Sequence, residues 1–391
     1  MNSTGTFFTH LECSKCGIHF SKNEIHNLSE CCSLPLIPCY DIDRANSRFK
    51  KQDLLNRLPT MWRYKEMMPV ESDENIITLG EGFTPLQYTK SLGNYFGLHH
   101  LFLKNEGINP TGSFKDRGMS ASISKAKEFR LEKISIPTAG NAGGATAAYA
   151  SKAGQSSFIY MPSDTPRAFQ VECHQYGAHV EMVDGVISDC GKLIAKRKDK
   201  EGWFDISTLK EPYRLEGKKT MGYELAEQFD WELPDAIIYP TGGGTGIIGM
   251  WKAFDEMEQL GWIGEKRPRM ISVQAEGCAP IVRAFKQGKD SADYFENPKT
   301  DALGLRVPVA VGDFLILQSI RESEGYALTV SDKELMDGVN IIGKHSGIFS
   351  APEGGATVAA IPKLLDKGIL SKSDQVVCFI TGNGLKYVDL F

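Results

Sequence analysis

From residue 101 onward, short apolar segments alternate with helical patterns, and this order restricts the chain to a mostly parallel sheet covered by helices. The predicted strands are residues 101–103, 134–136, 158–162, 180–183, 236–239, 270–273 and 375–380. The clearest predicted helices are residues 118–130, 141–154, 167–176, 221–229 and 314–322. The sequence therefore predicts an α/β fold of the doubly wound type.

The length allows two domains and a small appendage. The chain has 391 residues, of which 41% are hydrophobic and 24% are charged, so it can bury sizeable cores. We expect a Cys-rich knuckle at residues 11–40, a large α/β domain from 41–100 and 215–391, and a small α/β domain at 101–214. Residues 41–68 are charged and are expected to form a connecting helix with a solvated face.

Charge and composition exclude several classes of partner. The net charge is −5 and the sequence has no basic stripe, so nucleic acid is not an expected partner. No apolar run approaches the roughly 20 residues that span a bilayer. The first ten residues contain neither a basic leader nor an apolar signal core. We therefore expect a cytoplasmic protein that does not bind membranes.

Lys115 is the first candidate for chemistry. It follows the turn-forming sequence Asn-Pro-Thr-Gly at residues 109–112 and precedes the helix predicted at 118–130. A lysine beside the amides of a helix start lies where anions are favoured and the uncharged amine is stabilised. Such an amine can form a Schiff base with an aldehyde cofactor. The alternative is a solvated lysine that has no role in chemistry.

Two glycine-rich turns follow predicted strands and open predicted helices. In the first, small residues surround Asn141 and would let a flat ligand approach the backbone closely. The second would form a nest of amides for a phosphomonoester, and it consists of Gly242, Gly243, Gly244, Thr245 and Gly246. Its spacing matches neither the Walker A nor the dinucleotide motif. The alternatives are an Asn that only tolerates left-handed geometry and a tight turn without a ligand.

Two further side chains are candidates for ligand binding. Thr381 follows the last predicted strand, and a hydroxyl at the carboxyl end of a sheet strand can reach a bound ring. Arg214 precedes the helix predicted at 221–229 and is a candidate clamp for an anion. The alternative for Arg214 is an ordinary surface arginine in a loop.

Five of the nine cysteines lie within the first 39 residues. Cys13 and Cys16 form a Cys-x-x-Cys knuckle, and Cys31 and Cys32 would complete a tetrahedral zinc site of structural type. The second pair departs from the usual ribbon pattern because its members are adjacent. Three other residues could supply a missing ligand: His19, His26 or Cys39. The alternative is a degenerate knuckle that binds no metal.

An amine, a phosphate nest, a turn asparagine and a strand-end threonine together fit pyridoxal phosphate. Four segments also resemble threonine synthases, which belong to the tryptophan-synthase-β-like group of fold type II pyridoxal phosphate enzymes. The most specific segment is Asn-Pro-Thr-Gly-Ser-Phe-Lys-Asp at 109–116, and the others are 80–86, 140–143 and 381–386. The resemblance runs from about residue 11 to the C-terminus, and a knuckle like that at Cys13 occurs in some members.

This resemblance implies a role for each candidate residue. Lys115 would form the Schiff base and move protons, Asn141 would hold the ring hydroxyl, and Thr381 would hold the pyridine nitrogen. The second glycine-rich turn would hold the cofactor phosphate, while Thr138 and Arg214 would bind substrate. The cofactor would lie in a cleft between the two domains. The family converts O-phospho-L-homoserine and water to L-threonine and phosphate, and it suggests a homodimer.

Departures from the family pattern keep other functions open. Ala139 and Ala142 stand where threonine synthases usually carry hydroxyl residues, and the turn at 242–246 is closer to serine/threonine dehydratases. Glu211 stands where Asn is common, and its charge would repel a dianionic substrate unless Arg214 or Lys218 screens it. The alternative enzyme is therefore a pyridoxal phosphate-dependent threonine/serine dehydratase, which forms a 2-oxo acid and ammonia. The alternative outside enzymes is a catalytically silent protein that binds the cofactor.

Overall fold

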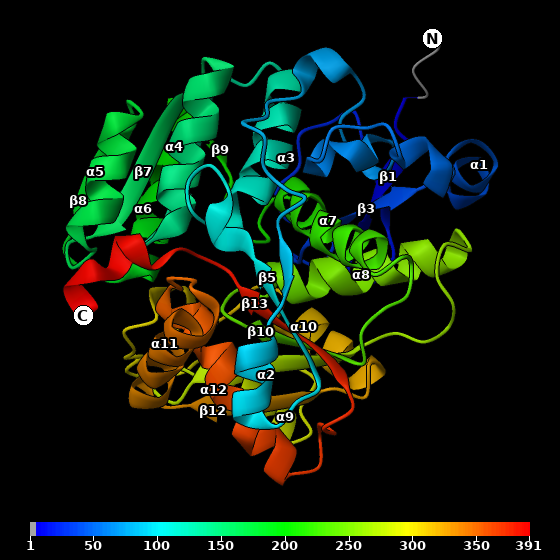
Figure 1. The fold of residues 1–391 in the computed structure, drawn as a ribbon. Helices are drawn as coiled ribbons and strands as arrows, with labels where there is room; N and C mark the ends of the chain where they lie inside the picture. Colours follow the sequence, from blue (N-terminus) through cyan, green and yellow to red (C-terminus); the bar gives the residue numbers. More distant parts are fainter. Residues whose placement is uncertain (1–4) are drawn as a thin grey trace. The chain divides into compact units, whose positions relative to one another are not determined.

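The computed structural model describes residues 5–391, which form two compact units (Figure 1). The first unit comprises the described residues up to Phe83, together with Lys115–Met221 and Asp255–Trp262. The second unit comprises Thr84–Phe114, Gly222–Phe254 and Ile263–Phe391. Each unit is therefore assembled from segments that are distant in sequence.

The first unit contains a four-stranded parallel sheet in the order β8-β7-β6-β9. Its strands are β6 (Lys133–Pro137), β7 (Ser156–Pro162), β8 (His179–Val183) and β9 (Phe204–Asp205). Its helices are α3 (Lys115–Glu128), α4 (Asn141–Ala153), α5 (Arg167–Gln175) and α6 (Ile187–Glu201). Ile159 and Met161 of β7 pack with residues of α3 and α4, whereas Tyr160 packs with residues of α6. Helices therefore cover both faces of this sheet, which confirms the predicted fold class.

A small antiparallel sheet in the order β2-β1-β3 also belongs to the first unit. Its strands are β1 (Phe8–Cys13), β2 (His19–Ser21) and β3 (Leu36–Tyr40). Leu11 and Leu36 are buried in one cluster with Tyr213, which lies far along the chain. Shared apolar packing therefore makes the Cys-rich segment a part of this unit, although the sequence predicts a separate appendage.

Residues 41–68 do not form the single solvated helix that their charge predicts. Helix α1 covers only Ile42–Arg48, and 3-10 turns follow at Lys51–Leu54, Met61–Met67 and Asp73–Asn75. Met61, Tyr64 and Met67 are fully buried. The end of this segment is therefore buried, because removing its apolar side chains from water gains more free energy than is lost by desolvating the flanking charged side chains.

The second unit contains a six-stranded sheet in the order β12-β11-β10-β13-β5-β4, in which only β4 is antiparallel to its neighbour. The strands are β4 (Leu86–Tyr88), β5 (His100–Asn105), β10 (Ala236–Pro240), β11 (Arg269–Ala275), β12 (Tyr326–Val330) and β13 (Gln375–Ile380). The helices are α2 (Lys90–Phe96), α9 (Pro280–Lys286), α10 (Asp313–Glu322), α11 (Asp332–Ser346) and α12 (Pro352–Asp366). The 3-10 turns are Glu106–Ile108, Leu303–Leu305 and Gly384–Leu390. Two helices contribute residues to both units: α7 (Tyr213–Gln228) and α8 (Thr245–Gln259).

Helices α11 and α12 lie side by side against the six-stranded sheet (Figure 1). Ile342 of α11 and Ile361 of α12 pack in one core cluster with Ile238 of the central strand β10. The start of α11 is fixed by a capping box, because Ser331 and Glu334 bond reciprocally to each other's backbone N–H groups. A serine followed three residues later by a glutamate is the sequence signature of such a cap.

The unit boundaries differ from the domain boundaries drawn from sequence. Strand β5 pairs with β13 along its whole length, from His100 opposite Gln375 to Asn105 opposite Ile380. Residues 101–114 therefore lie in the second unit, and residues 41–83 lie in the first. Strands β9 and β12 and helices α2, α6 and α9 have no counterpart among the predicted elements. Pairing between parallel strands joins distant segments, and a local sequence pattern does not show which segments will meet.

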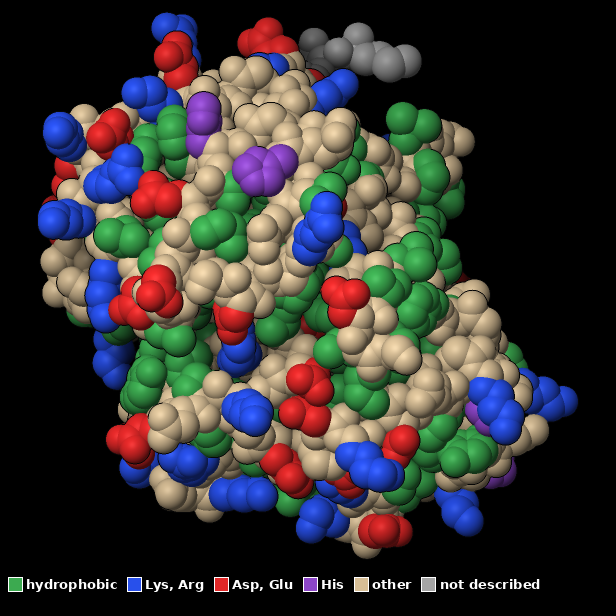
Figure 2. Space-filling view, turned by 90° about the vertical axis from the view of Figure 1, so that its left-hand side faces the viewer, with side chains coloured by type: hydrophobic (Ala, Val, Ile, Leu, Met, Phe, Trp, Pro, Cys, Tyr) green, Lys and Arg blue, Asp and Glu red, His purple; other side chains and the backbone are tan. Residues whose placement is uncertain are grey.

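The surface drawn in Figure 2 carries basic and acidic side chains interspersed with one another. This arrangement differs from the stripe of one sign that indicates a nucleic-acid surface. Among residues 5–391, no helix combines the length and the apolar character needed to cross a bilayer.

Lys104 and Glu224 form a fully buried ion pair in the second unit. The Lys104 ammonium donates to the Glu224 carboxylate at 2.9 Å, to the Gln228 side-chain oxygen at 2.9 Å and to the Thr84 carbonyl at 2.8 Å. Removing one partner of a buried pair costs about 3–5 kcal/mol, because the other charge loses its counterion. We predict that Lys104→Met lowers the free energy of unfolding by about this amount, as measured by urea denaturation.

The matched control is Lys333→Met. Lys333 forms an exposed pair with Asp337 at 3.0 Å, and exposed pairs contribute little to stability. We expect almost no change in the urea midpoint for this control. Equal losses in the two variants would contradict the view that burial makes the Lys104 pair important.

Candidate active site

Lys115 is the first residue of α3 and directly follows a turn that is fixed by backbone hydrogen bonds. Gly112 has a left-handed conformation (φ +75°), and its N–H donates to the Asn109 carbonyl at 2.7 Å. The N–H of Phe114 donates to the Thr381 carbonyl at 3.0 Å. The helix therefore begins three residues before the predicted start. The residue that precedes Lys115 is hydrogen-bonded to the residue that directly follows β13.

Helices α3 and α7 approach each other closely in the first unit. A Cβ at Gly118 would lie 2.0 Å from Lys218 Nζ, and a Cβ at Gly217 would lie 1.9 Å from a carbonyl oxygen of α3. This close approach lets Lys218 Nζ reach the Lys115 carbonyl oxygen at 3.3 Å. Burial and the nearby charges of Arg214 and Lys115 hold the pKa of Lys218 well below its usual range. The sequence names Lys218 only as a charge that could screen Glu211, and it places the residue before the helix, so it predicts neither the burial of this amine nor its contact with Lys115.

Arg214 lies in the first turn of α7 and is buried, so the surface-loop interpretation is wrong. Its guanidinium donates to the Ile206 carbonyl at 2.6 Å. The Glu211 carboxylate accepts the N–H groups of Tyr213 and Arg214 at 2.8 and 3.0 Å, so it stabilises the helix start. Burial raises the pKa of Glu211 to about 7, against the opposing charge of Arg214. Glu211, which stands where Asn is common in the family, therefore has a structural role.

We predict that Glu211 makes stability depend on pH. Its folded-state pKa of about 7 lies above the ordinary value of 4.5. Between these values the folded chain binds more protons than the unfolded chain, so raising the pH through this window lowers stability. Glu211→Gln has no group that titrates at this position, so it does not lose stability in this window. The free energy of unfolding of the variant minus that of wild type should therefore rise by on the order of 3 kcal/mol between about pH 5 and pH 8.

Urea denaturation at several pH values measures this effect. The exposed Glu232→Gln variant is the control, and its difference from wild type should stay flat over the same range. A difference between Glu211→Gln and wild type that does not change with pH would show that the pKa of Glu211 is not raised.

Asn141 opens α4 after the first glycine-rich turn. The Thr138 hydroxyl donates to the Gly140 carbonyl and accepts the Gly140 N–H, each at 3.2 Å, so it closes the turn before Asn141. The Asn141 Oδ1 atom is buried and has no hydrogen-bond partner within residues 5–391. Because buried amide oxygens are normally hydrogen-bonded, Asn141 fits a role in holding a polar group of a ligand.

The second glycine-rich turn connects β10 to α8, which begins at Thr245. Gly244 is left-handed (φ +83°), and a Cβ at Gly242 would lie 2.1 Å from the Gly304 carbonyl oxygen. The turn therefore excludes side chains at these positions. The N–H groups of the first turn of a helix lack intrahelical acceptors, and the helix dipole favours an anion there. The geometry thus fits a compact phosphate group.

Thr381 is buried directly after β13. The segment that follows it runs antiparallel to the turn before Lys115, with Ser113 opposite Gly382 and the Asn383 N–H bonded to the Gly112 carbonyl at 2.9 Å. The predicted site residues therefore fall into two sets. The first unit holds Lys115, Thr138, Asn141 and Arg214, and the second holds the turn at 242–246 and Thr381.

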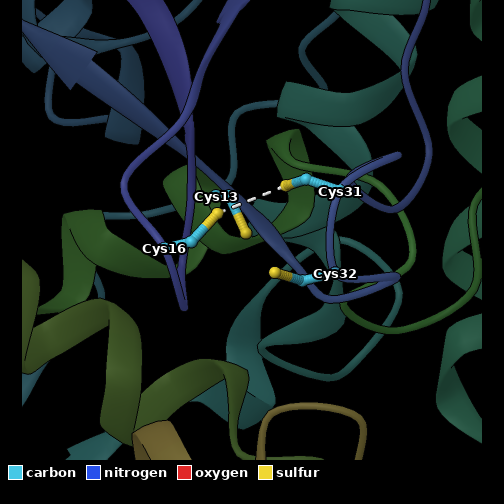
Figure 3. Close-up of side chains that lie close together, drawn as sticks. All are labelled: Cys13, Cys16, Cys31 and Cys32. Carbon is cyan, nitrogen blue, oxygen red and sulfur yellow. Dashed lines mark hydrogen bonds between the residues drawn. The ribbon is translucent and has the colours of Figure 1, made fainter.

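Four cysteines converge beside the small sheet and are called the four-cysteine group here (Figure 3): Cys13, Cys16, Cys31 and Cys32. Their sulfur atoms all lie within 4.8 Å of one another, and those of Cys16 and Cys31 are 3.4 Å apart. Burial raises the pKa of the Cys13 thiol, but hydrogen bonds with Ser29 and with backbone amides outweigh this effect and lower it to about 6. Four thiols at this spacing match the donor set of a tetrahedral zinc site. The alternative ligands lie outside the group: His19, His26 and Cys39.

Comparisons with known proteins place the chain in a family. A family model described as "Pyridoxal-phosphate dependent enzyme" matches residues 77–382. Threonine synthases from Methanocaldococcus jannaschii and Methanosarcina acetivorans are each 36% identical over 379 residues, which is 96% of this chain and 93% and 92% of theirs. Maize serine racemase has the same fold, with a TM-score of 0.68 and 23% identity over 78% of this chain and 90% of that chain. The chain therefore belongs to the threonine synthase family of pyridoxal-phosphate dependent enzymes.

Proposed function

We propose that this protein is a threonine synthase that uses pyridoxal phosphate to convert O-phospho-L-homoserine and water to L-threonine and phosphate. The observation that carries the proposal is the position of Lys115. It is the first residue of α3, and the N–H of the preceding residue, Phe114, donates to the Thr381 carbonyl. The choice of substrate is supported by the similarity to threonine synthases over 96% of the chain.

Each predicted site residue would have one task in holding the cofactor. Lys115 would form a Schiff base with the aldehyde and would carry protons as an amine. The Asn141 amide would meet the ring hydroxyl, and the Thr381 hydroxyl would meet the pyridine nitrogen. The amides of residues 242–246 would hold the phosphate. When bound, pyridoxal phosphate supplies an electron sink that protein side chains lack.

The guanidinium of Arg214 on α7 would favour a dianionic substrate, in the unit that contains Lys115. Lys218 is four residues further along, so it lies on the same face of the helix, where its amine would donate a hydrogen bond to such a substrate. The charge of Arg214 would offset the carboxylate of Glu211. We propose Arg214 as a substrate-binding residue, with Thr138 as a second one through the turn that its hydroxyl closes.

Two incubations test the proposed reaction. With O-phospho-L-homoserine, we expect release of phosphate together with an equal amount of threonine. The dehydratase alternative is favoured by Ala139, Ala142 and the glycine-rich turn at 242–246, and it predicts a 2-oxo acid and ammonia from threonine. A 2-oxo acid without phosphate release would favour that alternative, and no turnover of any amino acid would favour the silent binding protein.

We also propose that the four-cysteine group binds a structural zinc ion. The support is the distance of at most 4.8 Å between the four sulfur atoms. In cobalt-substituted protein, Cys16→Ser should lose most of the thiolate-to-metal charge-transfer absorption, and its thermal midpoint should fall. Lys15→Ala, within the same knuckle, is the control and should retain both. Unchanged absorption in Cys16→Ser would refute the proposal.

We propose a homodimer as the assembly, since the family resemblance implies one. Analytical ultracentrifugation of the protein loaded with pyridoxal phosphate should give twice the mass of one chain. Sedimentation at the mass of one chain would refute this assembly without affecting the proposed reaction.

A further inference from the structure

A second set of metal-binding side chains lies on the small three-stranded sheet and is called the mixed-donor group here: His10, Glu12 and Cys39. One ring nitrogen, one carboxylate oxygen and the sulfur all lie within 4.8 Å of one another. The Glu12 Oε2 and Cys39 Sγ atoms are 3.7 Å apart. Ligand atoms of a tetrahedral zinc ion stand roughly 3.3–3.8 Å apart, as bond lengths of about 2.0–2.3 Å require. The donors are therefore close to coordinating distances.

The register of the strands places these side chains on one face of the sheet. His10 and Glu12 are two residues apart on β1, so they point to the same side. Cys39 of β3 lies opposite His10, and His19 of β2 lies opposite Glu12. Opposed residues of antiparallel strands share a face, with Cβ atoms about 4.5–5.5 Å apart. All three strands therefore present a potential ligand to the same point.

The four-cysteine group uses the other face of this sheet. Cys13 follows Glu12 directly on β1, so its side chain points to the opposite side. There it is buried in one cluster with Leu11 and Leu36. The two groups share no residue. They are separate candidate sites, and either one can be removed without deleting a ligand of the other.

Hydrogen bonding prepares His10 for coordination. The Thr9 hydroxyl donates its single proton to the Cys39 carbonyl at 3.0 Å. His10 Nδ1 lies 2.8 Å from the same hydroxyl oxygen, so Nδ1 carries the proton of that contact. His10 Nε2 then has a lone pair, and it is buried without a hydrogen-bond partner in the described part of the chain. A histidine whose Nδ1–H is held by another residue is typical of metal sites.

His19 offers a fourth ligand. Its ring packs against that of His10 with centroids 3.9 Å apart, and its Nε2 lies 3.9 Å from Glu12 Oε2. The His19 side chain is 64% exposed. Its ring is therefore able to rotate until one nitrogen faces the other three donors.

We propose that the mixed-donor group, completed by His19, binds a metal ion of its own, for which Zn²⁺ is the best match. Imidazole, thiolate and carboxylate are the donors that zinc accepts in tetrahedral sites. Cys39 releases its proton on binding, so one thiolate and one carboxylate balance the two positive charges of the ion. The ion links all three strands of the small sheet on the face opposite to the four-cysteine group.

The zinc content of the purified full-length protein tests this proposal. After equilibration with zinc and removal of the excess, we expect two ions per chain by mass spectrometry of the metal. His10→Ala and Cys39→Ser should each retain one ion. His26→Ala is the matched control and should retain both, because His26 lies in the same segment and bonds to the Ser21 carbonyl at 3.0 Å, outside the group.

Cobalt titration of a Cys16→Ser/Cys31→Ser double variant isolates the mixed-donor group. We expect one equivalent of tetrahedral Co²⁺, with the charge-transfer absorption of a single thiolate. Adding His10→Ala should abolish both signals. If the double variant does not fold, the same titration of wild type and His10→Ala should differ by one equivalent. Equal metal content in wild type, His10→Ala and Cys39→Ser overturns the proposal, whatever the four-cysteine group binds.

Discussion

Lys115→Ala is expected to lower kcat by at least about 10³-fold, because the amine would both bond the cofactor aldehyde and carry protons. The nearby amine of Lys218 does not replace it, since that group is engaged by the Lys115 carbonyl at 3.3 Å. Phosphate release from O-phospho-L-homoserine measures the loss. Borohydride reduction followed by peptide mass spectrometry should place the cofactor on Lys115 in wild type and should give no labelled peptide in the variant.

The control for this substitution is Lys127→Ala on the same helix. Lys127 lies at the other end of α3, and its Nζ donates to the Glu74 carbonyl at 2.7 Å. This variant should keep the visible colour of the bound cofactor and its activity. Circular dichroism separates loss of the amine from loss of the fold. A borohydride label on Lys218 in wild type would refute the assignment of Lys115.

Gly242→Ala is expected to have the second large effect, a loss of at least about 10²-fold in affinity for pyridoxal phosphate. The added Cβ would lie 2.1 Å from the Gly304 carbonyl oxygen and 3.1 Å from Val307 Cγ2, so the turn must move. Each hydrogen bond to a charged group contributes about 1.5–3 kcal/mol, and displacing the turn would remove one or two of them. Fluorescence titration of the cofactor-free protein measures the dissociation constant.

Gly264→Ala is the matched control in the same unit. An added Cβ there meets no atom within 4 Å, so the variant should bind the cofactor as wild type does. Urea denaturation of both variants shows whether Gly242→Ala acts on the turn or on the whole unit. Wild-type affinity in Gly242→Ala would contradict the assignment of residues 242–246 to the cofactor phosphate.

Local patterns were sufficient to position most candidate residues on the correct elements. Helix α4 begins at Asn141, and Thr381 follows the last strand directly, as the sequence predicts. Both positions depend on an apolar strand followed by a small-residue turn, and this signal is contained in a few consecutive residues. The fold class is confirmed for the same reason, whereas the roles of the individual residues stay predictions.

An unusual local cap and contacts between distant segments account for what the sequence did not show. Helix α7 begins at Tyr213 because the buried Glu211 carboxylate accepts its N–H, and a glutamate at that position is not a usual capping signal. The burial of Lys218 depends on the close approach of α3 and α7 at Gly118 and Gly217, which is tertiary. The pairing of β5 with β13 likewise determines which unit contains residues 101–114.

Of the two groups of potential metal ligands, the sequence predicted one and not the other. Spacing alone predicted the four-cysteine group, and the adjacent Cys31 and Cys32 both reach it (Figure 3). The mixed-donor group could not be predicted from the sequence, because His10 and Cys39 become neighbours only through the register of β1 and β3.

The position of β13 has a consequence for protein synthesis. This strand comes last in chain order, yet it lies between β10 and β5 in the six-stranded sheet. While the ribosome is still adding residues 375–380, β5 and β10 lack the neighbour that separates them in the finished sheet, and unpaired strand edges readily pair with those of other nascent chains. A stop codon just before residue 375 should therefore yield insoluble protein, and chaperones should be needed until β13 has been synthesised.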